Sequence, residues 1–123
     1  MAIGVKQRQK DSEKLPTRHF SSIQESAVAK SVGGKRTANS GATDFGGKSD
    51  VSIHGLFNIE CKTKTTNSDS ISIKKEWIEK NKREAVFDGN KYSAIAFNFG
   101  PNQDNYYIID EFLFKELVEH LKE

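Results

Sequence analysis

The strongest constraint on the fold comes from two short segments in the middle of the chain in which apolar and polar residues alternate. The segments are 50–54 (DVSIH) and 58–63 (NIECKT). An alternation with a period of two is typical of strands that bury one face and expose the other. Three residues, 55–57, separate the segments, and this is an acceptable length for a hairpin connection. We therefore expect an antiparallel hairpin.

The register of this hairpin decides which charged side chains meet. Matching the apolar sides gives four cross-strand pairs: Ile53 with Ile59, Val51 with Cys61, Ser52 with Glu60, and Asp50 with Lys62. In this register Cys61 faces the core as a small apolar residue. Asp50, Glu60 and Lys62 are expected together on the polar face.

The rest of the chain predicts one domain of mixed α/β (α+β) class. The pattern after Ser21 indicates a helix with Ser22 as its N-cap and Glu25 in a capping box, ending at Gly33-Gly34. The other expected elements are a short strand over 35–37, a helix over 74–87, a buried strand over 92–99, a strand over 106–109 and a final helix capped by Asp110. Residues 38–49 read as a loop. The expected domain covers 19–123, after a basic, flexible arm over 1–18.

The composition excludes several other classes of protein. The single cysteine cannot form an intrachain disulfide or a structural zinc site by itself. The sequence contains no apolar run of the roughly 20 residues that a membrane span needs, and its first residues lack the apolar core of a secretory signal. We expect a cytoplasmic protein that does not bind membranes.

Positive charge is concentrated in the first part of the chain. Residues 1–49 contain nine Lys or Arg and four Asp or Glu, whereas residues 50–123 contain ten and thirteen. Basic segments neutralise the phosphates of nucleic acids, so this distribution is compatible with a polyanionic partner. An ordinary solvated basic surface explains the charge pattern equally well.

Asp50, Glu60 and Lys62 together predict hydrolytic chemistry. Two carboxylates on neighbouring strands can hold a hard divalent ion such as Mg²⁺, which prefers oxygen ligands. Such an ion lowers the pKa of a bound water, and a nearby ammonium group stabilises developing negative charge. The alternative interpretation is a cross-strand salt bridge on a solvated sheet face.

These residues resemble the PD-(D/E)xK nuclease superfamily, and within it the small Holliday-junction resolvases of archaea and phages. The resemblance covers about 22–99 and includes the αβββαβ order of elements. The matching positions are Glu25 on the first helix, Ser40-Gly41 in the loop, Asp50 on the second strand and Glu60-Cys61-Lys62 on the third. Ser49 stands where the family motif has proline, and Lys35-Arg36 matches the family's basic position only loosely.

The resemblance implies a restriction-endonuclease-like core, with a mixed central sheet flanked by helices, plus a C-terminal strand and helix. It implies that Asp50, Glu60 and the Cys61 carbonyl bind Mg²⁺, that Mn²⁺ substitutes, and that Lys62 assists the attacking water. Glu25 is either a further catalytic residue or only a helix cap. The candidate DNA-binding residues are Lys35, Arg36, Ser40, Lys48 and Lys74, each of which is also consistent with an ordinary surface or loop residue.

The favoured function is a homodimeric, metal-dependent DNA endonuclease that cuts four-way junctions. Two alternatives stay open. The first is a nuclease with the same site that acts on other DNA in repair, nicking or restriction. The second is a module of the same fold that binds nucleic acid without cleaving it.

Overall fold

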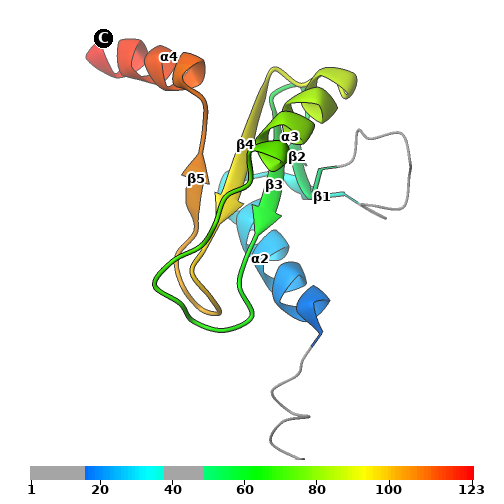
Figure 1. Ribbon diagram of the computed structural model, residues 1–123. Helices are drawn as coiled ribbons and strands as arrows, with labels where there is room; N and C mark the ends of the chain where they lie inside the picture. The colour runs from blue at the N-terminus through cyan, green and yellow to red at the C-terminus, as the bar shows by residue number, and fades with distance from the viewer. Residues whose placement is uncertain (1–15, 38–48) are drawn as a thin grey trace, which may run out of the picture.

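The computed structural model describes residues 16–37 and 49–123 of the chain (Figure 1). Three helices and five strands follow in the order α2 (Thr17–Val32), β1 (Lys35–Arg36), β2 (Val51–Ile53), β3 (Phe57–Lys62), α3 (Lys75–Phe87), β4 (Tyr92–Phe97), β5 (Tyr106–Ile108) and α4 (Glu111–Lys122). This order confirms the mixed α/β class and the predicted sequence of elements. No helix in the described ranges is long and apolar enough to cross a membrane.

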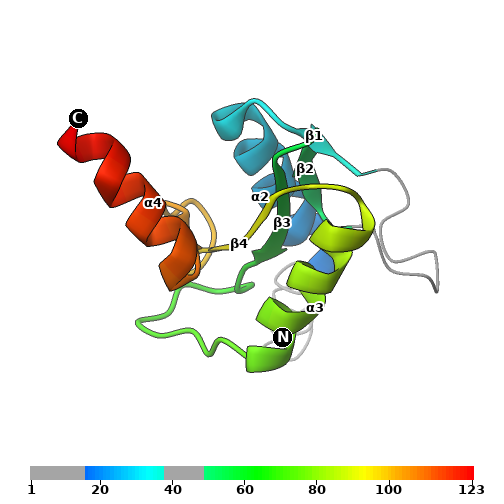
Figure 2. The same cartoon turned by 90° about the horizontal axis from the view of Figure 1, so that it is seen from above.

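The strands form one sheet in the order β1-β2-β3-β4-β5. Strands β3 and β4 are parallel and are joined through α3, while the other neighbours are antiparallel. Helices α2 and α3 lie on opposite sides of the sheet (Figure 2). Beneath α2, the main core contains Val28, Ala29, Val51, Ile59, Cys61, Ala94 and Ala96.

Strand β3 lies between a hairpin partner and a parallel partner, so its two faces meet different surroundings. Ile59 and Cys61 point into the core beneath α2, as predicted. Side chains alternate along a strand, so Glu60 and Lys62 lie on the other face, the side of α3. The helix is thus positioned to contribute to any site built on Glu60 and Lys62.

The expected start of the first helix is wrong. Helix α2 begins at Thr17, directly after Pro16, and Ser22 lies inside it. Proline disfavours helix at the residue before it, and its fixed φ suits a helix start, so Pro16 sets the boundary. The capping-box role of Glu25 is therefore excluded. The end of the helix is as predicted, with Gly33 at a left-handed φ of 71°.

The expected boundary of the arm also shifts slightly, because residues 17 and 18 already belong to α2. Residues 1–15, which make up the rest of the predicted arm, lie outside the described ranges. So do Ser40 and Lys48, two of the predicted DNA-binding residues.

The hairpin forms, but its register differs from the prediction by two residues. Val51 pairs with Ile59, and Ile53 pairs with Phe57. The connection is 54–56, in which Gly55 has a φ of 74° that glycine adopts without strain. A shift by two keeps the same faces buried. It moves Asp50 from the level of Lys62 to the level of Glu60.

Helix α4 extends away from the sheet after β5 (Figure 1). As predicted, Asp110 caps it: the side chain of Asp110 accepts a hydrogen bond from the amide of Leu113. Leu113 is the buried residue of α4, whereas Phe114, Leu117 and Leu121 are exposed. The helix therefore presents an apolar side to its surroundings.

The connection between α2 and β1 approaches β2 closely at Gly34, which gives a test of this packing. A Cβ at Gly34 would lie 2.8 Å from the carbonyl oxygen of Ser52 and 3.1 Å from Val51 Cγ1. Gly34→Ala should therefore lower the free energy of unfolding by about 1–3 kcal/mol, measured by urea denaturation. Gly33→Asn is the control, because Gly33 has open space around it and Asn tolerates its backbone conformation. Equal stability of Gly34→Ala and the wild type would contradict the packing described.

Candidate active site

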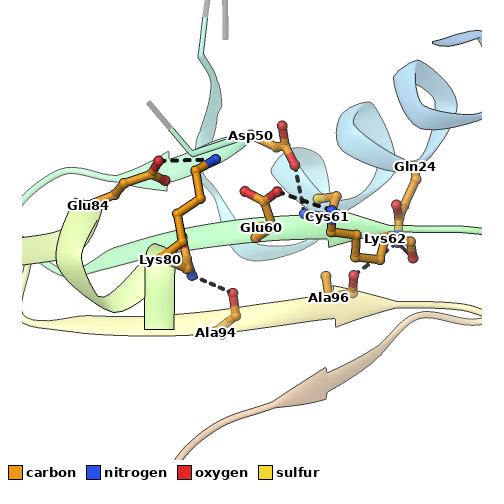
Figure 3. Close-up of polar contacts among 10 residues, drawn as sticks. Gln24, Asp50, Glu60, Cys61, Lys62, Lys80, Glu84, Ala94 and Ala96 are labelled. Carbon is orange, nitrogen blue, oxygen red and sulfur yellow. Dashed lines mark hydrogen bonds and ion pairs between the residues drawn. The ribbon is translucent and has the colours of Figure 1, made fainter. Parts of the chain in front are cut away.

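The candidate site lies just before β2 begins, where Asp50 meets β3. The amide of Cys61 donates a hydrogen bond of 2.8 Å to Oδ2 of Asp50 (Figure 3). This bond takes the place of a backbone pairing and fixes the carboxylate beside Glu60-Cys61-Lys62. Since the amide and carbonyl of one strand residue point to the same side, the Cys61 carbonyl is also directed to the side of Asp50.

Lys62 is held in the same group. Its Nζ lies 3.5 Å from Oε2 of Glu60 and 4.2 Å from the centre of the Trp77 ring. The Lys62 side chain is 27% exposed, so the ammonium group is partly desolvated but reachable. Trp77 is only partly buried and covers this lysine. Asp50, Glu60 and Lys62 are thus brought together, as predicted.

Glu25 reaches the edge of this group from α2. Its Oε1 forms a 3.0 Å ion pair with Nη2 of Arg36, which also donates from Nη1 to Ser26. Burial and the charge of Asp50 raise the pKa of Glu25, although the hydrogen bond from Arg36 opposes the increase. Glu25 therefore lies within electrostatic reach of Asp50, and Arg36 neutralises it.

Negative charge dominates the site, because the carboxylates are not fully neutralised by the positively charged side chains around them. Burial and the charge of Asp50 raise the pKa of Glu60 to about 7. Burial also raises the pKa of Asp50, against the lowering effect of the Cys61 amide and Lys62. Burial and the three surrounding carboxylates raise the pKa of the Cys61 thiol, so the thiol stays protonated. The site has the electrostatic character of one that binds a cation.

The donor set fits Mg²⁺ rather than a metal held entirely by side chains. Within 16–37 and 49–123, no three His, Cys, Asp or Glu side chains are grouped closely enough to ligate one ion. Mg²⁺ is commonly bound through one or two carboxylates while it keeps several waters. Asp50, Glu60 and the Cys61 carbonyl would meet that requirement with oxygen atoms alone.

Helix α3 adds two charged residues that the sequence interpretation missed. Lys80 Nζ lies 3.4 Å from Oε2 of Glu84, whose side chain is almost fully buried (Figure 3). The charge of Lys80 lowers the pKa values of Asp50 and Glu60. Trp77, Lys80 and Glu84 are spaced by three and four residues, so they share one helix face. This spacing is the sequence signal from which their position on one helix face could have been predicted.

Gln24 is the other residue that was missed. It is 3% exposed, and its amide nitrogen donates to the backbone carbonyls of Lys62 (2.9 Å) and Ala96 (3.3 Å), as Figure 3 shows. These bonds connect α2 to the ends of β3 and β4. Gln24 therefore fixes the backbone that carries Lys62, but no pattern of residue spacing in the sequence indicates this role.

The described candidates for DNA contact lie on different sides of the site. Lys35 and Arg36 are exposed on β1, the edge strand, where Arg36 is engaged by Glu25. Lys74 directly precedes α3, with its Nζ 5.9 Å from the centre of the Trp77 ring. Lys74 therefore flanks Lys62 and Arg36 flanks Glu25, whereas Lys35 pairs with Ser52 and points to the face of the sheet opposite to Arg36.

Comparison of the chain with protein-family models, with curated proteins and with solved structures finds no match. The case for a function therefore depends on the residues and their geometry.

The raised pKa of Glu60 predicts a specific pH dependence of stability. The folded chain holds the Glu60 proton up to about pH 7, whereas the unfolded chain releases it near the ordinary value of 4.5. The contribution of Glu60 to folding is therefore complete below about pH 4.5 and is lost as the pH rises toward 7. In EDTA, Glu60→Gln should be more stable than the wild type at about pH 8, by up to about 3 kcal/mol, and should show no such advantage at about pH 4.

Thermal melting at the two pH values, with and without Mg²⁺, measures this effect. Added Mg²⁺ should raise the melting temperature of the wild type at pH 8 and should leave that of Glu60→Gln nearly unchanged. A Glu60→Gln variant that is less stable than the wild type at pH 8 would contradict the electrostatic description. It would mean that the ion pair with Lys62 outweighs the cost of burial.

Proposed function

We propose that the protein is a metal-dependent DNA endonuclease that hydrolyses phosphodiester bonds, with a four-way junction as its favoured substrate. The single observation that carries the proposal is the hydrogen bond from the Cys61 amide to Asp50. This bond sets one carboxylate beside a second carboxylate, a strand carbonyl and an ammonium group. That is also the arrangement implied by the resemblance to the PD-(D/E)xK nucleases.

Asp50, Glu60 and the Cys61 carbonyl are the groups that would hold Mg²⁺. When bound, the ion polarises a phosphoryl oxygen and lowers the pKa of a coordinated water. The chain's own contribution is to orient these oxygen atoms before substrate arrives. Hydrolysis adds the water oxygen to phosphorus and breaks the bond to the 3′ oxygen, leaving a 5′ phosphate and a 3′ hydroxyl group.

Lys62 is suited to stabilise the negative charge that develops on the phosphate. Its ammonium group is held by Glu60 and by the face of Trp77, and it lies on the same side of the sheet as Glu60. A charged donor that is already oriented in a partly desolvated site is worth more than one in water. Lys80, held by the buried Glu84, supplies a second positive charge facing the two carboxylates.

Resolution of a four-way junction requires paired nicks on strands related by a two-fold axis, which a symmetric dimer supplies. We place the contact between two copies on the exposed apolar side of α4, formed by Phe114, Leu117 and Leu121. A 12-residue helix is marginally stable by itself, so packing of this side against a second copy would also stabilise α4.

Cleavage of a labelled four-way junction, compared with a linear duplex of matched sequence, tests the proposed activity. The wild type should make paired, symmetric cuts in the junction when Mg²⁺ or Mn²⁺ is present and none in EDTA. Lys62→Ala should reduce the rate at least about 100-fold while keeping the wild-type melting temperature within a few degrees. Lys91→Ala, before β4 at the opposite end of the sheet, is the control and should cut normally.

The outcomes separate the alternatives. Equal cutting of both substrates would favour a nuclease that acts in repair, nicking or restriction. Binding without cutting, unaffected by Lys62→Ala, would favour a non-catalytic module. Full activity of Lys62→Ala would contradict the proposed site.

Sedimentation measurements test the dimer. The wild type should sediment as two chains, and the double substitution Leu117→Asp, Leu121→Asp should give single chains, because it places charge in the apolar contact. Lys115→Gln changes the charge of the same helix away from this side and should remain dimeric. A wild type that sediments as single chains at all concentrations tested would exclude this contact.

A further inference from the structure

Three aromatic rings form a cluster at the end of the sheet that carries Lys62. The ring centres of Phe97, Phe99 and Tyr106 lie 5.6–5.9 Å from one another. Phe97 and Phe99 are partly buried, whereas Tyr106 is 52% exposed. The planes of Phe97 and Tyr106 differ by 30°, so Phe97 supports Tyr106 from one side as a near-parallel neighbour. We call these three residues the aromatic patch.

The aromatic patch adjoins the candidate active site on the same face of the sheet. Lys62 is the register partner of Phe97, and Phe97 is the register partner of Tyr106. Directly paired residues share a face, so the three side chains form one row across β3, β4 and β5. Trp77 of α3 packs against the Lys62 ammonium group at one end of this row, and Lys74 lies near the same ring.

Two loops fix the backbone beside the patch. The amide of Ser68 donates to the carbonyl of Phe99 at 2.8 Å, and the side chain of Gln103 donates to that of Asn67 at 3.0 Å. Gly100 permits this close approach, because a Cβ there would lie 2.6 Å from Cα of Asn67. The rings are therefore held in place before any ligand binds.

An exposed aromatic ring with neighbouring ammonium groups indicates the chemical class of ligand that would bind here. Nucleobases stack on aromatic rings independently of their sequence, while lysines neutralise the phosphates that connect them. A cluster that served only as a small core would bury its rings, yet about half of Tyr106 is open to solvent. An apolar ligand would make no use of Lys62 and Lys74.

We propose that the aromatic patch is a stacking site for an unstacked base of the DNA strand whose phosphate lies at Asp50, Glu60 and Lys62. This inference rests on the proposed nuclease function and specifies its substrate class. Base stacking is interrupted at a branch point or an unpaired stretch, so a base face is available there and is hidden in continuous duplex. The patch would thereby favour branched over linear DNA.

Binding measured in EDTA tests the site apart from cleavage. The probes are a four-way junction with 2-aminopurine at the branch point and a linear duplex with the same label. Binding of the wild type to the junction should quench the 2-aminopurine, since its fluorescence falls on stacking. Tyr106→Ala should remove the quenching and weaken junction binding about 5- to 150-fold, while leaving duplex binding within about twofold. Tyr106→Phe keeps the ring and should behave as the wild type.

Tyr107→Ala is the matched control, because Tyr107 is the exposed neighbour whose side chain lies on the opposite face, paired with Ala96. It should retain wild-type quenching and affinity. Equal affinity of Tyr106→Ala and the wild type for the junction would overturn the stacking site, as would equal weakening on both DNAs. If either of these results is obtained and the wild type still cleaves DNA in Mg²⁺, only the proposal of a stacking site is rejected. If the wild type neither binds nor cleaves either DNA, the nuclease proposal fails with it.

Discussion

The arrangement of the candidate site depends on the hydrogen bond between the Asp50 carboxylate and the Cys61 amide. Strand β2 is short and begins at Val51, directly after Asp50, whereas β3 extends to Lys62. The last part of β3 therefore continues beyond its hairpin partner, where its backbone groups have no strand to pair with on that side. Asp50 satisfies the first of these groups with its side chain. An unpaired buried amide would be costly, so the bond is required by the fold as well as by the site. The same bond leaves Asp50 close enough to Glu60 for the charge of Asp50 to oppose the ionisation of Glu60.

Helix α3 and helix α2 complete the site from opposite faces of the sheet. Helix α3 contributes charge and shape: Trp77 lies against Lys62, and the buried Glu84 directs Lys80. Helix α2 contributes backbone support through Gln24, which binds the ends of two parallel strands at once. The carboxylates lie between these supports, and the positive charges around them are too few and too exposed to neutralise them fully. A divalent cation would resolve that imbalance.

Local signals in the sequence predicted the elements well, and tertiary contacts account for what they missed. Gly33 and Asp110 mark helix ends through backbone conformation and capping, which depend on a few adjacent residues. The predicted and observed hairpin connections are both three residues long, but the observed one begins one residue earlier and has Gly55 in a left-handed conformation at its centre. Alternation alone could not reveal this difference, because it cannot distinguish registers that differ by an even number. Glu60, Lys62 and Asp50 could be grouped from the hairpin alone. The contacts of Gln24, Trp77 and Lys80 could not, because they require α2 and α3 to be docked on the sheet.

The central claim is that Asp50 and Glu60 form a binding site for a divalent cation. A crystal structure of the protein soaked in Mn²⁺ tests it most directly, because the anomalous signal locates the ion without reference to activity. The account predicts a peak about 2.0–2.3 Å from oxygen atoms of both Asp50 and Glu60, with the Cys61 carbonyl as a third ligand, and no peak there in Asp50→Asn. An empty site in which Lys62 or Lys80 alone neutralises the two carboxylates at a saturating Mn²⁺ concentration would contradict it.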